Sequence, residues 1–254
     1  MQFFDSDSVR IAYIDVAPAQ GPGDPVLLIH GFASTHAVNW VNTLWVKTLT
    51  GAGYRVIAFD NRGHGQSGKL YDAAAYHSSI MAEDARRLLD HLDIAQADVM
   101  GYSMGARITA HLALQHPARV RSALIGGIGI KLVEGIGLPT SIADALEAPS
   151  LEAVSDPMGR MFRAFAEQTK SDLKALAACI RGSRQVLSRE QVAEIKVPAL
   201  IAVGTRDEVA GPPHALAALM PNARALDIPG RDHNLAVGDK MHKEGVLAFL
   251  AERP

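Results

Sequence analysis

The sequence is poor in cysteine, in net charge and in long apolar runs. Cys179 is the only cysteine among 254 residues, which excludes an internal disulfide and a zinc site built from cysteines, so we expect its side chain simply to pack. A formal net charge of -2 offers little attraction for nucleic acid or an anionic membrane. No apolar run is long enough to cross a bilayer, and the first ten residues lack the features of a secretion signal. We therefore expect a cytoplasmic protein without nucleic-acid or membrane partners.

Motifs for metals and nucleotides are also missing. No His-Glu-x-x-His or comparable metal spacing occurs, so we expect no metal and no cofactor. Gly63, Gly65 and Gly68 have the spacing of a dinucleotide fingerprint after a predicted strand, but no helix is predicted there to receive a pyrophosphate. The same stretch resembles a phosphate loop, yet Leu70 stands where Ser or Thr would hold magnesium. Neither pattern predicts a nucleotide site.

Apolar runs that alternate with helical patterns predict an α/β fold. A turn-broken stretch from Phe3 to Val16 predicts an antiparallel hairpin. Six later apolar runs predict buried strands: Val26 to Ile29, Arg55 to Phe59, Asp98 to Gly101, Val120 to Ile125, Ala199 to Val203 and Ala225 to Ile228. Helical patterns cover Asn42 to Ala52, Tyr76 to Leu92, Met104 to His116, Pro213 to Met220 and Asp239 to Ala251. We predict a mostly parallel twisted sheet with helices on both faces.

Spacing within the predicted helices indicates which side chains face water. In the segment Tyr76 to Leu92, Ile80 belongs to the apolar stripe and Asp84 to the charged residues available for the wet face. His111 and His242 also lie on predicted helices. We expect these two histidines at the surface and without a catalytic role.

The segment Ile128 to Lys196 interrupts the alternation of strands and helices. It lacks a convincing strand and carries helical signals at Ser141 to Ala148, Ser150 to Val154, Met158 to Ala166, Asp172 to Ile180 and Ser188 to Glu194. We interpret residues 128–196 as a helical cap inserted into a core formed by residues 1–127 and 197–254. The sheet then continues beneath the cap.

Ser103 stands where an apolar run ends and a helical pattern begins. The stretch Gly101-Tyr-Ser-Met-Gly105 predicts a strand, a sharp turn and a helix, with Ser103 at the apex. Its glycines remove side chains that would collide where strand and helix approach, and the positive end of the helix favours negative charge near the hydroxyl. We predict that Ser103 is a nucleophile, although the pattern also fits a simple turn before a helix.

A serine nucleophile needs a base, and the base needs an acid to orient it. His233 follows the last predicted strand, in a loop that can bring its imidazole over the carboxyl edge of the sheet. Asp207 follows the strand before, whereas Asp232 adjoins His233 and Asp60 follows a different strand. We predict His233 as the base and Asp207 as the acid that orients it.

Two backbone amides are predicted to stabilise an oxyanion. One belongs to Met104, immediately after the nucleophile, and the other to Phe32, in the loop after the strand Val26 to Ile29. Gly31 would allow a tight approach of this loop. The loop also fits an ordinary strand-to-helix turn, and only geometry separates the two interpretations.

Together these residues resemble the α/β-hydrolase superfamily over nearly the whole chain. The resemblance consists of His30-Gly31-Phe32, Asp60 to Ser67, the turn at Ser103, then Asp207 and His233 in that order. It implies a small capped serine esterase or hydrolase, in which the insertion is a lid and the substrate lies between lid and sheet. It also implies that the Asp60-to-Ser67 loop is structural, so we assign Arg62 and His64 no catalytic role.

The insertion carries the hints about the substrate. Met158, Met161, Phe162 and Phe165 recur at helical spacing and either pack in the core or line a substrate pocket. Between Lys131 and Lys196, nine basic and nine acidic residues balance. We therefore expect a small-molecule ester that is neutral or weakly polar, while the oligomeric state is not predicted.

Several other activities share this arrangement. The superfamily also contains lactonases, hydrolases of carbon–carbon bonds and cofactor-free perhydrolases. The stretch Gly101 to Arg107 is similar to that of the menaquinone-pathway lyase, which would need cationic groups in its pocket. A receptor that binds a small ligand without hydrolysing it is the alternative from a different class. The fold alone does not choose among them.

Overall fold

An eight-stranded sheet forms the centre of the computed structural model, which describes residues 1–135 and 138–253. The strand order is β1-β2-β4-β3-β5-β6-β7-β8. The strands are β1 (Gln2–Ser6), β2 (Val9–Val16), β3 (Pro25–Ile29), β4 (Arg55–Phe59), β5 (Ala97–Tyr102), β6 (Val120–Gly126), β7 (Ala199–Gly204) and β8 (Ala223–Ile228). The first two form the predicted hairpin, β2 pairs antiparallel with β4, and the remaining neighbours are parallel. The predicted α/β-hydrolase fold, with its mostly parallel sheet, is confirmed.

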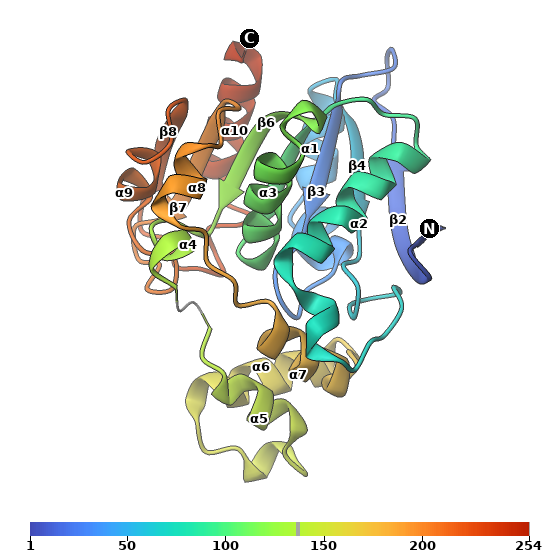
Figure 1. Cartoon of the computed structure of the whole chain (residues 1–254), viewed down its shortest axis with the longest axis vertical. Helices are drawn as coiled ribbons and strands as arrows, with labels where there is room; N and C mark the ends of the chain where they lie inside the picture. The colour runs from blue at the N-terminus through green and yellow to red at the C-terminus, as the bar shows by residue number, and fades with distance from the viewer. Residues whose placement is uncertain (136–137, 254) are drawn as a thin grey trace.

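Helices cover both faces of the sheet (Figure 1). They are α1 (Trp45–Gly51), α2 (Ser78–His91), α3 (Met104–Gln115), α4 (Lys131–Glu134), α5 (Ser141–Glu147), α6 (Pro157–Gln168), α7 (Leu173–Gly182), α8 (Arg189–Ala193), α9 (Pro213–Ala217) and α10 (Lys240–Glu252). In β3, Leu27 and Ile29 share a cluster with α2 and α3, whereas Val26 and Leu28 share one with α1 and α10. Burial on both faces explains why the strands are continuous apolar runs in the sequence.

Helices α5, α6 and α7 form a separate layer at one end of the sheet, at the bottom of Figure 1. Helix α7 packs on the single turn η2 (Ala73–Tyr76), and a Cβ on Gly182 would lie only 1.9 Å from the carbonyl oxygen of Ala73. By contrast, α4 and α8 lie beside the sheet. The separate layer thus contains a shorter stretch of chain than the predicted cap of residues 128–196. The division into core and cap stays a prediction.

One helix begins later than its pattern predicts. The pattern from Asn42 to Ala52 becomes α1 only at Trp45, after Leu44 takes a left-handed φ of 67°. Before it lies a π-helical turn, η1 (Ala37–Val41). This turn was not predicted, and it supplies Asn39 to the site described below.

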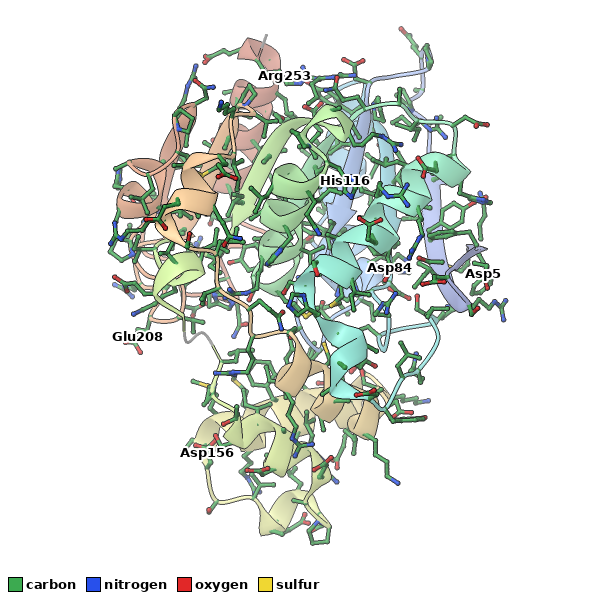
Figure 2. The ribbon with its side chains drawn as sticks, viewed as in Figure 1. Asp5, Asp84, His116, Asp156, Glu208 and Arg253 are labelled. Carbon is green, nitrogen blue, oxygen red and sulfur yellow. The ribbon has the colours of Figure 1, made fainter. Side chains whose placement is uncertain are left out.

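The predicted faces of α2 are wrong at two positions. Asp84, labelled in Figure 2, is 1% exposed and accepts hydrogen bonds from Nε and Nη2 of Arg62, each at 2.7 Å. Ile80 is instead 38% exposed. The physical reason is that the buried guanidinium of Arg62 needs a counter-ion, and Asp84 is the acid that reaches it.

The two histidines expected at the surface are buried. His111 lies on α3, whose residues from Met104 to Ala113 are all buried because α2 and neighbouring elements cover it on every side. His242 on α10 packs its ring against Trp45, with 5.1 Å between ring centroids. Burial lowers the pKa of both imidazoles to about 4, so both are neutral. The prediction for Cys179 is confirmed, since it is buried.

Candidate active site

Ser103 lies on a strained turn between β5 and α3. Its φ of 54° and ψ of -112° fall outside the regions that residues other than glycine favour. Its neighbours leave no room for side chains. A Cβ on Gly101 would lie 2.1 Å from the carbonyl oxygen of Gly105, and one on Gly105 would lie 2.0 Å from that of Ile29. The strand, turn and helix predicted around Ser103 are therefore present.

Three side chains from separate loops join in one hydrogen-bonded row. Ser103 Oγ lies 3.0 Å from His233 Nε2, and His233 Nδ1 lies 2.7 Å from Asp207 Oδ2. Asp207 follows β7 and His233 lies between β8 and α10, so both loops meet Ser103 at the carboxyl edge of the sheet. Because an ionised carboxylate only accepts hydrogen bonds, Nδ1 carries the proton and Nε2 accepts from the Ser103 hydroxyl. This is the arrangement that a serine nucleophile and its base would require.

Hydrogen bonds that involve backbone groups hold Asp207 and His233 in place. The Asp207 side chain is 0% exposed, and its Oδ1 accepts from the amides of Val209 at 2.9 Å and Ala210 at 3.0 Å, which leaves Oδ2 for His233. Tyr102 donates its hydroxyl proton to the carbonyl oxygen of His233 at 2.6 Å. Sequence reasoning missed this contact because a tyrosine at the end of a buried strand looks like any core residue.

The loop after β3 lies against the turn at Ser103. A Cβ on Gly31 would come 3.5 Å from Ser103 Cβ and 3.2 Å from the Tyr102 carbonyl oxygen, so glycine permits this approach. Among the described residues, the amide of Phe32 donates to no protein acceptor. Met104 is the first residue of α3, where an amide has no intrahelical acceptor. Two amides are thus available in the two segments that meet at Ser103.

Buried polar side chains fix the shape of this loop. The amides of Gly31, Ala33 and His36 donate to Asn39 Oδ1 at 2.8 Å, His64 Nε2 at 3.2 Å and Asp60 Oδ1 at 2.9 Å, respectively. Burial, and to a lesser extent the electrostatic effect of the nearby His30, lowers the pKa of His64 to about 3. The ring is therefore neutral and can accept the hydrogen bond. Sequence reasoning took the Asp60-to-Ser67 loop only as structural. The signal that could have linked the two loops is that β3 and β4 are neighbouring parallel strands.

An apolar groove of about 330 Å³ borders Ser103 and His233. The ring of Phe162 packs against Phe32 with 5.7 Å between centroids, and Met161 and Phe165 also line the groove. Three of the four apolar residues predicted to line a pocket therefore do so. Met158 lies about one helical turn before Met161 on α6, is 36% exposed and does not line this groove, contrary to its predicted place in a pocket. That the other three contact a substrate stays a prediction.

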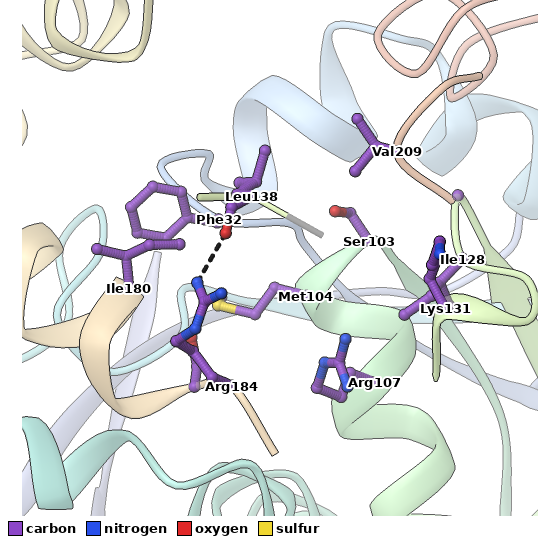
Figure 3. A pocket seen from close by; sticks show the side chains of 12 residues that line it. Phe32, Ser103, Met104, Arg107, Ile128, Lys131, Leu138, Ile180, Arg184 and Val209 are labelled. Carbon is purple, nitrogen blue, oxygen red and sulfur yellow. Dashed lines mark hydrogen bonds between the residues drawn. The ribbon is translucent and has the colours of Figure 1, made fainter. Parts of the chain in front are cut away.

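A second, smaller pocket of about 70 Å³ also borders Ser103 (Figure 3). Arg107 from α3, Lys131 from α4 and Arg184 from the segment after α7 lie around it. The side chains of Phe32 and Leu138 line both this pocket and the apolar groove. Ser103 therefore stands where an apolar compartment meets a cationic one.

The part of the chain that the structure describes holds neither a cluster of metal ligands nor a membrane-spanning helix. Within residues 1–135 and 138–253, no three His, Cys, Asp or Glu side chains gather where a metal ion could bind. In that part of the chain, no helix is both long and apolar enough to cross a membrane. The absence of a cofactor and of nucleic-acid partners, and the cytoplasmic location, stay predictions.

Comparisons with known proteins identify similar chains and folds. The family model described as alpha/beta hydrolase fold matches residues 24–138. A Mycobacterium tuberculosis protein named as the non-heme bromoperoxidase BpoC is 29% identical over 251 residues, which cover 89% of this chain and 91% of that protein. The enol-lactonase of Burkholderia xenovorans LB400 has the same fold, with a TM-score of 0.81, 21% identity and coverage of 99% and 100%. The meta-cleavage product hydrolase CumD of Pseudomonas fluorescens IP01 also shares it, with a TM-score of 0.80, 21% identity and coverage of 100% and 98%.

Proposed function

This chain belongs to the α/β-hydrolase superfamily, and from that premise we propose that it is a serine hydrolase that cleaves carboxylic esters through an acyl-enzyme on Ser103. The observation that carries the proposal is the row of hydrogen bonds from Ser103 through His233 to Asp207, at 3.0 Å and 2.7 Å. A receptor that only binds a ligand needs no such row. The geometry therefore favours catalysis over the receptor alternative.

The acylation step uses each of these groups. His233 Nε2 takes the proton of the Ser103 hydroxyl while Oγ attacks the ester carbonyl carbon, and the amides of Phe32 and Met104 stabilise the oxyanion. The carbonyl then re-forms as the bond to the leaving alcohol breaks. His233 returns the proton to the alcohol oxygen, and Asp207 stabilises the imidazolium during the step.

Water completes the cycle. His233 takes a proton from a water molecule, whose oxygen attacks the acyl carbon through the same oxyanion site. The bond to Ser103 Oγ breaks, Oγ regains its proton from His233, and the carboxylic acid leaves. The two compartments that meet at Ser103 offer space for the two halves of an ester.

The likeness to BpoC favours a second candidate reaction on the same acyl-enzyme. If hydrogen peroxide replaces water as the attacking group, the product is a peracid instead of a carboxylic acid. The acylation step is unchanged, so the two candidates differ only in the second half-reaction. Analysing products formed with and without added peroxide separates them.

The proposal is tested with 4-nitrophenyl butyrate and with a fluorophosphonate, which phosphonylates active serines with loss of fluoride. We expect hydrolysis by the wild type, one adduct located at Ser103 by peptide mass, and loss of turnover by roughly 10³-fold or more in Ser103→Ala. The remaining serines of the chain are the internal control for labelling. Unchanged turnover in Ser103→Ala, or an adduct on another serine, would overturn the proposal.

A further inference from the structure

Among the described residues, cations and no acidic side chain line the small pocket beside Ser103. Arg107, Lys131 and Arg184 are its charged lining residues. Lys131 pairs with Glu134 at 2.9 Å on the exposed rim. Arg184 donates to the carbonyl oxygen of Leu138 at 2.7 Å, the dashed line in Figure 3. The pocket therefore combines a positive field with direct access to the nucleophile.

Arg107 differs from the other buried arginines of the described chain. Arg62, at 5% exposed, forms two hydrogen bonds with Asp84, and Arg163, at 6%, pairs with Glu167 at 2.6 Å. Arg107 is 8% exposed, but its hydrogen-bond partner among the described residues is the neutral carbonyl oxygen of Gln185. A buried cation without an anion is unfavourable. The pocket side of Arg107 thus lacks a counter-ion.

The positive charge of Arg184 adds to the unpaired positive charge of Arg107. Burial and then the neighbouring charge of Arg184 lower the pKa of Arg107 to about 10, so the guanidinium remains protonated at neutral pH. Guanidinium groups bind planar carboxylates through two parallel hydrogen bonds. A cavity of about 70 Å³ has room for several water molecules and so for a carboxylate with a short methylene chain.

The position of His233 indicates which half of the substrate lies in each compartment. His233 lines the apolar groove and is absent from the lining of the cationic pocket. Because His233 must return a proton to the leaving oxygen, the alcohol half lies on its side, in the groove. The acyl half then extends from Ser103 towards Arg107.

We propose that the acyl half of the substrate carries a second, ionised carboxylate that binds Arg107 and Arg184 in this pocket. The substrate class is therefore half-esters of short dicarboxylic acids with an apolar alcohol, or lactones that open to such acids. This inference rests on the proposed serine hydrolase function. It replaces the expected neutral substrate, which followed from counting charges over the insertion without their positions.

The test compares two esters of similar length and the same leaving group, mono(4-nitrophenyl) glutarate and 4-nitrophenyl valerate. We expect wild type to have the higher kcat/KM for the glutarate ester. In Arg107→Met, which keeps an apolar stem, the ratio of the two kcat/KM values should fall roughly 10- to 100-fold, the usual weight of a charge-assisted contact. Arg184→Met should lower the ratio in the same direction, and the exposed Arg189→Met should leave it unchanged.

A binding measurement gives a readout that does not need turnover. Glutarate should bind Ser103→Ala in calorimetry, and the affinity should fall at least tenfold when Arg107→Met is added, while circular dichroism confirms that both proteins are folded. Equal kcat/KM values of the wild type for the two esters, with the same ratio in Arg107→Met, would overturn the inference. The proposed serine hydrolase function would not be affected by that result. Absence of hydrolysis and of labelling at Ser103, with glutarate binding that depends on Arg107, would instead overturn the hydrolase and retain the anion pocket.

Discussion

The two sides of the site are built differently. On the sheet side, the loops after β3, β4, β7 and β8 hold each polar side chain by hydrogen bonds, as in the row from Asp207 to His233 and in the bond from Ala33 to His64. On the other side, α6 presents apolar side chains to the groove, of which Met161 is 50% exposed. Rigid partners suit groups that must meet reacting atoms, whereas adaptable methionine and aromatic side chains suit varied substrates. We therefore expect the sheet side to set the reaction and the α6 side to set which apolar alcohol half of the substrate binds.

Acidic pH should distinguish the two regions most strongly, because the buried histidines that it destabilises all lie outside residues 128–196. None of the ten histidines lies within residues 128–196, whereas burial lowers the pKa of four core histidines: His30, His111 and His242 to about 4 and His64 to about 3. Their unfolded forms gain protons below about pH 6.5, and the folded rings do not until about pH 4. Unfolding therefore takes up protons, and stability falls as the pH drops through this window.

The measurement is urea unfolding at pH 7 and pH 5, with wild type and His111→Leu. We expect each buried histidine to contribute about 2 kcal/mol to the loss of unfolding free energy between these pH values. The variant should lose less by about that amount, because one titrating group is gone. Its stability at pH 7 should change little, since Nε2 of His111 has no hydrogen-bond partner in the described structure. Equal losses in both proteins would contradict the expectation.

Asp207→Asn should produce the largest change in rate. An asparagine amide can donate to Nδ1 of His233 and stabilise the wrong tautomer, so we expect kcat to fall by roughly 10⁴-fold. The chain offers a matched control, because Asp227 forms a similar pair with His214 at 2.8 Å on the exposed surface. Asp227→Asn should leave kcat unchanged. A comparable rate for both variants would mean that the Asp207 pair is only structural.

His64→Ala should have an intermediate effect, because it acts on the loop and not on the reacting atoms. Without an acceptor for the Ala33 amide, the neighbouring Phe32 amide loses its fixed position, and we expect kcat to fall roughly tenfold with little change in KM. Gln at position 64 can accept the same hydrogen bond, so His64→Gln should recover part of the loss. A rise in KM alone would argue against a positioning role.

Phe162→Ala should have the smallest effect, and it should change KM and not kcat. Removing a half-buried ring from the groove weakens binding of an apolar alcohol half, and we expect KM to rise roughly 3- to 10-fold with kcat retained. Met158→Ala on the same helix is the matched control, since Met158 does not line the groove. The comparison between the two sides fails if Phe162→Ala lowers kcat while His64→Ala raises KM.

The positions of the sheet side could be predicted because they follow from chain order. Strands such as Val26 to Ile29 were predicted to within one residue of β3 (Pro25–Ile29). Ser103, Asp207 and His233 each follow a strand, and the carboxyl ends of parallel strands meet at one edge. Their proximity therefore needed only the sheet, although their catalytic roles stay proposals.

The rest depends on packing between segments that sequence spacing does not fix. Met158 and Met161 share one helical stripe, yet only Met161 lines the groove, because the orientation of α6 against the core decides it. Asp84 was misplaced because its partner, Arg62, is distant in the sequence. Arg107 lies one helical turn after Ser103, but only the folded structure reveals that no acidic residue among those described pairs with it.

The bond from the Tyr102 hydroxyl to the carbonyl oxygen of His233 has a consequence for protein engineering. It fastens the loop that carries the imidazole directly to the residue before the nucleophile. A designer who transplants residues 101–105 into another scaffold would therefore need to graft residues 229–235 with them. Otherwise the hydrogen bond that positions the His233 loop against the Ser103 turn would be lost.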